Sequence, residues 1–268
     1  MLIQTYTQKG GQAYKMKEII AVVNRRGGVG KTVTAHAIGA GLRLQGYKVL
    51  FIDLDSQCNL TYDLGVDAAT ITTYDLLTSN ASALDAVIKT DQGDLLAASP
   101  ALSNADTAIT GTGKEYKLKE AIEPLKPLYD YFIIDTPPAL GALTINALTA
   151  ADSLIIPAQA EIHSLQGIGL LNEAIEAVER YTNPSLTIKG ILITRYNQRT
   201  ILSKDMKANL EAIAQELGTK VFKTPIRENI SLKEAQAMRL DIFTYAPKSN
   251  AAKDYTALIK ELNPKKKG

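Results

Sequence analysis

A glycine-rich stretch near the N-terminus has residue types that bind phosphate. It reads NRRGGVGKT, from Asn24 to Thr32, and lies between the apolar run IIAVV and an amphipathic stretch over residues 32–44. This order predicts a strand, a turn and a helix, in which backbone N–H groups and the helix N-terminus surround an anion. Glycines let the main chain approach the anion, lysine supplies charge, and threonine supplies a ligand for Mg²⁺. The sequence therefore predicts a nucleoside triphosphate site formed by Gly27, Gly28, Val29, Gly30, Lys31, Thr32 and Val33.

Aspartates stand at the ends of two later apolar runs. Asp53 ends VLFID and is followed by Asp55, and Asp135 ends YFIID. A buried carboxylate is unfavourable unless a metal, water or a cation compensates it. Because ligands of open α/β sheets sit at the C-terminal edge of the strands, we expect all three carboxylates to face the phosphates. Each could instead cap the turn that follows it, and for Asp53 this alternative is as strong as the metal role.

Five motifs in order resemble one protein family. The loop departs from the general phosphate-loop pattern at Arg25 and matches the deviant K-G-G-x-G-K-T loop of the ParA/MinD family, with Arg26 in place of its signature lysine. VLFIDLDSQCNLT resembles the D-x-D-P-Q motif, with Ser56 for proline, and YFIIDTPPALGALTINAL resembles the Walker B strand and switch segment. TPIRENISLKEA and YAPKSNAAKDYTALIKEL are similar to C-terminal landmarks. From about Lys17 to Leu262 the chain is most similar to the ParA/Soj-type partition ATPases.

The resemblance implies an ATPase that uses ATP and Mg²⁺ and is slow until a partner stimulates it. Asp55 would orient the attacking water, Asp135 would hold the metal through a water, and the backbone near Pro225 would read the base. The implied catalytic residues are Asp55, Lys31 and Arg26. The implied metal site comprises Thr32, Asp135 and Asp53.

Arg26 decides whether nucleotide joins two copies of the chain. In the family, the signature lysine reaches the phosphates bound by the other subunit, so that ATP holds a homodimer together. Arg26 supplies the same charge, and its planar fork can bind phosphate oxygens in pairs. We therefore expect dimerisation on ATP binding. The alternative is that Arg25 and Arg26 form only a solvated basic pair.

Composition and segment order predict one α/β domain. The 268 residues, 46% hydrophobic, can bury a core without disulfides, and the single cysteine, Cys58, excludes an internal disulfide and a cysteine-bound cluster. Residues 1–16 are interpreted as a flexible N-terminal extension, 17–262 as a single ATPase domain and 263–268 as a basic tail. No apolar run reaches the ~18 residues of a membrane span, and the N-terminus lacks the apolar core of a signal peptide. We expect a cytoplasmic protein which, by the resemblance, associates with the nucleoid.

Alternating strand-like and helix-like segments predict a predominantly parallel, twisted sheet with helices on both faces. The expected strands are 18–24, 48–53, 95–98, 131–135, 153–157, 186–194 and 220–222. The expected helices are 32–44, 114–125, 164–181, 203–217 and 251–262. Ser203 is expected to cap one helix, and Ser231 with Glu234 suggests a capping box for another.

Positive charge is concentrated in the last third of the chain. Residues 186–240 contain ten Lys or Arg and five Asp or Glu, a net of +5, whereas the whole chain is +2. The resemblance implies DNA binding without sequence preference, and the matching segments offer Arg199, Lys204, Arg227 and Lys233. Because no aromatic residue is interleaved with them, we expect contacts to the phosphates of duplex DNA. The alternative is a solvated basic face.

Several functions remain open at this point. The first is a ParA-type switch that dimerises on ATP, coats DNA and is released when a ParB-like partner stimulates hydrolysis. The second is a MinD-like switch at a membrane surface, anchored by apolar residues that recur at helical spacing near the C-terminus; the same spacing fits a helix docked on the core. The third is a nucleotide-binding regulator that no longer hydrolyses. A dinucleotide-dependent oxidoreductase would leave Lys31 and Thr32 unexplained.

Overall fold

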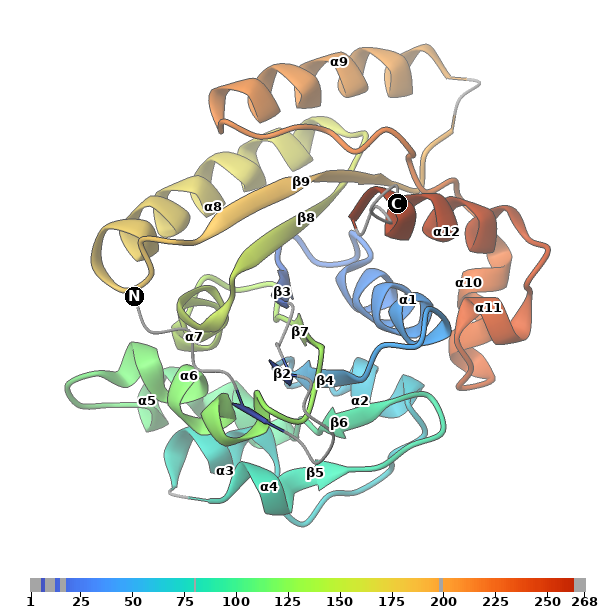
Figure 1. The fold of residues 1–268 in the computed structure, drawn as a ribbon. Helices are drawn as coiled ribbons and strands as arrows, with labels where there is room; N and C mark the ends of the chain where they lie inside the picture. Colours follow the sequence, from blue (N-terminus) through green and yellow to red (C-terminus); the bar gives the residue numbers. More distant parts are fainter. Residues whose placement is uncertain (1–5, 8–12, 15–17, 80, 198–199, 263–268) are drawn as a thin grey trace.

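A seven-stranded sheet forms the centre of the molecule (Figure 1). The structure, a computed structural model, describes residues 6–7, 13–14, 18–79, 81–197 and 200–262. The sheet strands are β3 (Glu18–Val22), β4 (Val49–Asp53), β5 (Val87–Ile88), β6 (Asp94–Leu96), β7 (Tyr131–Asp135), β8 (Ser153–Gln159) and β9 (Thr187–Thr194). Their order is β5-β6-β4-β7-β3-β8-β9, and every neighbouring pair except β5–β6 is parallel. The predicted fold class is confirmed.

Helices cover both faces of this sheet, as predicted. One layer contains α1 (Lys31–Leu44), α2 (Asn59–Asp63), α10 (Ile230–Ala237), α11 (Ile242–Tyr245) and α12 (Asn250–Leu262). The other contains α3 (Thr73–Thr78), α4 (Ala83–Ala86), α5 (Ala105–Ala108), α6 (Lys117–Ile122), α7 (Ala142–Ala150), α8 (Ile162–Tyr181) and α9 (Ile201–Glu216). In Figure 1, α1 and α12 lie on one side of β3 and α7 lies on the other. Short 3₁₀ helices occupy Pro100–Asn104, Lys114–Tyr116 and Glu123–Leu125.

The two helical layers divide the side chains of each strand between two cores. In β3, Ile19 and Ala21 belong to the core under α7 and α8, and Ile20 and Val22 belong to the core under α1 and α12. All four are at most 1% exposed. A parallel strand buried on both faces reads as a continuous apolar run rather than an alternating one. This is why the strands were visible in the sequence as short apolar blocks.

The sheet differs from the prediction at both of its edges. The predicted strand at 220–222 forms only an isolated bridge, in which Val221 is paired with Ile191 and the Phe222 N–H donates to the Ile191 carbonyl at 3.0 Å. The short antiparallel strand β5 was not predicted. Edge segments of two or three residues depend on pairing with a distant strand, and their own residues carry little local signal.

Both predicted helix caps were wrong. The hydroxyl of Thr200 accepts the N–H of Ser203 at 3.3 Å, so Thr200 caps α9. The side chain of Asn229 accepts the N–H of Ser231 at 2.9 Å, so Asn229 caps α10. Helix α9 therefore begins two residues before Ser203, and α10 begins one residue before Ser231. Threonine and asparagine are themselves favourable capping residues, so the sequence offers two nearby candidates in each case.

The predicted terminal segments lie largely outside the described residues. Within the N-terminal extension, β1 (Tyr6–Thr7) and β2 (Ala13–Tyr14) pair in antiparallel fashion. The flexible extension and the basic tail at 263–268 stay predictions. In the part of the chain that the structure describes, no helix has the length and apolar character needed to cross a membrane.

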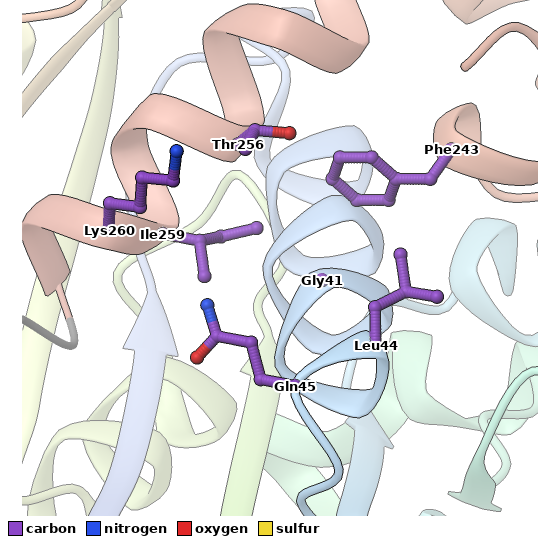
Figure 2. A pocket seen from close by; sticks show the side chains of 7 residues that line it. All are labelled: Gly41, Leu44, Gln45, Phe243, Thr256, Ile259 and Lys260. Carbon is purple, nitrogen blue, oxygen red and sulfur yellow. The ribbon is translucent and has the colours of Figure 1, made fainter. Parts of the chain in front are cut away.

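The apolar face of α12 packs against the core. Tyr255, Leu258 and Ile259 are at most 2% exposed, and the Tyr255 hydroxyl lies 3.2 Å from the hydroxyl of Thr34 on α1. Figure 2 shows Ile259 of α12 beside Gly41 of α1, where the two helices meet. The spacing that suggested a membrane anchor is therefore that of a docked helix, and these side chains are unavailable to a lipid surface.

A close contact of α1 with the sheet gives a test of the packing. A Cβ added at Gly39 would lie 2.1 Å from Cε1 of Phe51 on β4. We expect Gly39→Ala to lower the free energy of unfolding by about 1–3 kcal/mol through overpacking. The control is Gly169→Ala in α8, where no heavy atom lies within 4 Å of the added Cβ, and where helix propensity should raise stability by about 0.5–1 kcal/mol. Urea unfolding measures both, and equal effects would contradict the packing described here.

Candidate functional site

The predicted glycine-rich loop joins β3 to α1 at the C-terminal edge of the sheet. Gly28 has φ +74° and Gly30 has φ +90°, both in the left-handed region that favours glycine. Gly30 directly precedes α1, so the loop leads into the N-terminus of a 14-residue helix. The loop therefore has the strand–turn–helix setting in which backbone N–H groups bind phosphate.

Side chains at the ends of neighbouring strands brace this loop. Asn24 accepts the N–H of Arg26 at 2.9 Å and donates to the Pro157 carbonyl at 2.7 Å. Gln159 donates to the Gly28 carbonyl at 2.9 Å, and the Thr194 hydroxyl donates to the Val29 carbonyl at 2.8 Å. The bracing roles of Asn24, Gln159 and Thr194 were not predicted from the sequence. Their signal was the one that identified the aspartates: a polar residue that ends or directly follows an apolar run.

The Lys31 side chain is buried and binds the main chain of the glycine-rich loop. The residue is 7% exposed, and its Nζ donates to the Arg26 carbonyl at 3.1 Å. Burial lowers the pKa of Lys31, and the charges of Asp135 and Asp55 oppose that shift. The ammonium group thus lies within electrostatic reach of both carboxylates, as the sequence led us to expect.

Asp135 is a buried carboxylate that the protein compensates only in part. It is 0% exposed, and within the described residues neither of its oxygens has a partner in good hydrogen-bond geometry, although the nearby Thr32 side chain lowers its pKa. Burial, together with the charge of Asp53, raises the pKa of Asp135 well above its ordinary value. Such a group is unfavourable unless a cation compensates it. The chemistry of Asp135 therefore fits a metal ion held near the phosphate loop.

Asp53 is paired with Asp135 across β4 and β7, yet its oxygens are already engaged. Oδ1 accepts the N–H of Asp55 at 3.0 Å, and Oδ2 accepts the N–H and the hydroxyl of Thr61 at 2.9 and 2.8 Å. Burial raises the pKa of Asp53 to about 6, and these hydrogen bonds oppose the shift. The contacts are those of the capping alternative, in which Asp53 holds the turn that carries Asp55.

Asp55 lies beside an open pocket. The residue is 8% exposed, and its Oδ1 accepts the N–H of Gln57 at 3.1 Å. A pocket of about 340 Å³ separates the Asp55 turn from the segment after β7, including Pro138 and Gly141. At the far wall, the carboxylate of Asp106 accepts the N–H of Ala142 at 2.6 Å and so fixes the start of α7. The Asp55 carboxylate therefore borders a space that a water molecule or a partner side chain can enter.

The protein itself does not form a metal cage. Within the described residues, no three His, Cys, Asp or Glu side chains converge closely enough to hold an ion. This arrangement suits Mg²⁺, which keeps several waters and is commonly held by one or two carboxylates together with phosphates. Thr32, in the first turn of α1, and Asp135 are the residues that fit a phosphate-bound Mg²⁺. Asp53 would act on the metal only indirectly, because its oxygens are occupied.

A small pocket of about 80 Å³ continues from the phosphate loop toward α10. It is lined by Val29, Gly30 and Val33 on one side and by residues 226–229 on the other. Pro225, where we expected base recognition, does not line it; the four residues that follow do. The apolar pocket in Figure 2, of about 550 Å³, is a separate feature at the C-terminal end of α1. That end lies about 20 Å of helix from Lys31.

Arg26 is not a freely solvated cation. Its guanidinium donates to Glu161 at 2.7 Å, and Nη1 is buried without a hydrogen-bond partner in the described part of the chain. Arg25, by contrast, is exposed. The two arginines therefore do not form an equivalent solvated pair. Glu161, which precedes α8, is a further residue that the sequence analysis missed.

The basic region of residues 186–240 is partly neutralised within the fold. Among its described side chains, five basic residues form ion pairs, and four of the acidic partners come from outside the region: Lys189–Glu18, Lys207–Glu211, Lys220–Glu261, Arg227–Asp254 and Arg239–Asp67. Arg227 binds Asp254 through two nitrogens, at 2.6 and 2.9 Å. Lys233 is exposed. Lys204 lies in α9, and Arg199 lies outside the described residues.

Known proteins share both the sequence and the fold. The family profile of an AAA domain matches residues 17–188. The sporulation initiation inhibitor protein Soj of Bacillus subtilis is 39% identical over 92% of this chain and 98% of its own length. The solved structure of cobyrinic acid a,c-diamide synthase from Mycobacterium smegmatis with an ATP analogue and magnesium has TM-score 0.80 and 34% identity, covering 92% of this chain and 94% of that one. A McdA variant from Cyanothece in complex with ATP has TM-score 0.82 and 27% identity, covering 94% and 98%.

Replacing Asp135 and Asp53 by asparagine should change the free energy of unfolding in opposite directions. We expect Asp135→Asn to raise the free energy of unfolding of the nucleotide-free protein at pH 7 by about 1–3 kcal/mol, because it removes a buried carboxylate that Lys31 and Thr32 compensate only in part. Asp53→Asn should lower it by about 1–3 kcal/mol, because its amide cannot accept all three hydrogen bonds. Urea unfolding measures both variants. A loss of stability in Asp135→Asn as large as in Asp53→Asn would contradict this account.

The same experiment has a pH dependence. Because the pKa of Asp135 in the folded state lies above its ordinary value of 3.8, the folded protein binds more protons than the unfolded chain as the pH rises past that value. This contribution to the free energy of unfolding therefore falls with rising pH. The fall should be shallower in Asp135→Asn.

Proposed function

Since the chain belongs to the ParA/Soj family of P-loop ATPases, we propose that it is an ATP-dependent, dimerising switch that binds DNA without sequence preference. Hydrolysis, stimulated by a ParB-like partner, would release it from DNA and so move a plasmid or chromosome region at the nucleoid. The chromosome partitioning protein ParA of Caulobacter vibrioides, 35% identical over 91% of this chain, supports this role. The observation that carries the nucleotide site is the buried carboxylate of Asp135, which Thr32 and Lys31 compensate only in part.

ATP and Mg²⁺ are the proposed cofactors. The loop amides and Lys31 would bind the β- and γ-phosphates, and Thr32 and Asp135 would hold the metal. Bound Mg²⁺ supplies neutralisation of the charge that develops on the transferred phosphoryl group. Phosphoryl transfer depends mainly on positioning and charge stabilisation, so a single carboxylate suffices to orient the attacking water. Asp55, at the edge of its pocket, is the residue that we propose for that role.

Dimerisation requires that Arg26 exchange one partner for another. In a single copy its guanidinium is paired with Glu161, whose side chain is 48% exposed. An exposed ion pair of this kind contributes about 0–1 kcal/mol. The phosphates of a nucleotide bound by the second copy offer stronger, charge-assisted hydrogen bonds to a planar fork. Release of Arg26 from Glu161 is therefore compatible with ATP acting as the link between two copies.

DNA binding would use the cations that the fold leaves uncompensated. Lys233 on α10 is exposed, and Arg195 and Lys223 are exposed nearby in the same basic region. Arg227 contributes less than the sequence suggested, because Asp254 neutralises it. Contacts of a few lysines and arginines to phosphate predict weak, salt-sensitive binding that ATP-dependent pairing of two copies would strengthen.

The alternatives lack comparable support. The MinD-like membrane switch loses its anchor, since Tyr255, Leu258 and Ile259 are buried. Against the regulator that does not hydrolyse stands Asp55, which is held at an open pocket between its own turn and the segment after β7. A dinucleotide-dependent oxidoreductase conflicts with membership in an ATPase family. The amide-forming activity named for the Mycobacterium protein has no separate supporting observation in this chain.

The role of Arg26 can be tested by sedimentation with ATP and with ADP. We expect the unmutated chain to dimerise with ATP and not with ADP. Arg26→Ala should raise the dissociation constant of the ATP-dependent dimer by a factor of about ten or more. Glu161→Gln should strengthen the ATP-dependent dimer about two- to fivefold, because it removes the competing ion pair. If Arg26→Ala dimerises with ATP as well as the unmutated chain does, Arg26 does not act across the interface.

The DNA contacts can be tested by gel retardation in a salt series. Lys233→Ala should weaken ATP-dependent DNA binding equally for unrelated sequences and reduce the slope of log affinity against log salt by about one. Lys114→Ala, which removes an exposed lysine beside α6 in the other helical layer, is the matched control and should change neither. Retardation that is absent with ATP even at low salt would remove DNA from the proposed function.

A further inference from the structure

A buried threonine stands behind the turn that carries Asp55. Thr61 of α2 is 5% exposed. Its hydroxyl donates to Oδ2 of Asp53 at 2.8 Å and accepts the N–H of Ala98 at 3.0 Å. Its own N–H donates to the same Asp53 oxygen at 2.9 Å. The hydroxyl therefore uses both its donor and an acceptor, and it ties the end of β4 to the segment that follows β6.

Two further links lead from Thr61 to the proposed catalytic carboxylate. The other oxygen of Asp53, Oδ1, accepts the N–H of Asp55 at 3.0 Å. The Asp55 carbonyl then accepts the N–H of Cys58 at 2.8 Å, and Cys58, with φ +55°, directly precedes α2. One end of the turn from Asp53 to Cys58 is thus bonded to Thr61 of α2, and the other end leads directly into α2. Any displacement of the Asp53 carboxylate would displace the main chain of Asp55.

Contacts from α10, from the residue that follows it closely and from Gln92 hold α2, the helix that carries Thr61, in place. Gln236 donates to Oδ2 of Asp63 at 2.9 Å, and Gln92 donates to the Asp63 carbonyl at 3.1 Å. The Arg239 guanidinium lies 3.9 Å from the centroid of the Tyr62 ring. A five-residue helix is not stable by itself, so these contacts determine where α2 lies. Consecutive residues of α2 therefore contact the Asp55 turn on one side and α10 on the other.

We propose that Thr61 is a positioning residue for ATP hydrolysis: its hydroxyl orients the Asp53 carboxylate, which fixes the main chain of Asp55 and directs the Asp55 carboxylate toward the attacking water. The proposal rests on the proposed function, in which Asp55 orients that water. Among the described residues, the hydroxyl of Thr61 bonds to Asp53 and Ala98 and to no residue of the phosphate loop, so it acts on the rate of hydrolysis rather than on nucleotide binding. A misplacement of about 1 Å at a reacting group can lower a rate by as much as about 100-fold.

The test compares two variants at position 61 with a control elsewhere. Thr61→Val keeps the shape of the side chain and removes the hydroxyl, whereas Thr61→Ser keeps the hydroxyl. Thr149→Val is the matched control, because Thr149 on α7 is 0% exposed and its hydroxyl contacts only Thr182 among the described residues. Phosphate release under saturating Mg²⁺ and ATP gives kcat, and equilibrium titration with ATP gives Kd. Thermal melting reports folding in each case.

We expect Thr61→Val to lower kcat by a factor of about ten or more with Kd for ATP unchanged within about twofold. Thr61→Ser should restore kcat to within about twofold of the unmutated chain. Thr149→Val should lose stability and keep its kcat. If Thr61→Val does not fold, Thr61→Ala, which also removes the hydroxyl, replaces it with the same expectation.

Three results would overturn the proposal: an unchanged kcat in Thr61→Val, equal losses of kcat in Thr61→Val and Thr149→Val, or a loss confined to nucleotide affinity. Absence of phosphate release from the unmutated chain would instead overturn the proposed function. The two failures are therefore distinguishable.

Discussion

The burial of two adjacent carboxylates at the ends of β4 and β7 is the constraint on which the rest of the structure depends. Asp53 and Asp135 are register partners and are both 0% exposed, so burial raises the pKa of each, and the charge of Asp53 raises that of Asp135 further. The protein compensates them differently. Asp53 receives three hydrogen bonds from the turn and helix that follow it, whereas Asp135 has only the nearby Thr32 side chain and the charge of Lys31 to offset its burial. Asp53 thus holds the turn that follows it, and Asp135 remains available to bind a cation.

The topology explains how distant segments reach this place. In a parallel sheet the carboxyl ends of the strands meet at one edge, and β3, β4, β7, β8 and β9 each deliver a polar side chain there. Two covering layers keep the strands dry on both faces, which strengthens every electrostatic interaction at the edge. The hydrogen bonds from Gln159 and Thr194 to loop carbonyls show that strands more than 120 residues away in sequence shape the glycine-rich loop.

The sequence was most informative where the signal is local. The strand at 131–135 was predicted with its observed bounds, because a short apolar run between polar residues is unambiguous when both faces are buried. Features that depend on pairing were missed: the two-residue strand β5, the strand-end groups Gln159 and Thr194, and the Arg26–Glu161 ion pair. The net positive charge predicted for residues 186–240 was too large for the same reason. It was summed along the chain, whereas four acidic residues from outside this region pair with its cations in the fold: Glu18, Asp67, Asp254 and Glu261.

The docking of α12 on α1 affects how the protein folds during its synthesis. The core beneath the glycine-rich loop includes Tyr255 and Ile259, which a ribosome adds some two hundred residues after α1. Until they emerge, α1 has an uncovered apolar surface. The half of the molecule that binds nucleotide therefore cannot close before α12 is made, and a chain terminated before α12 would leave this surface open to chaperones and proteases rather than yield a partly active product.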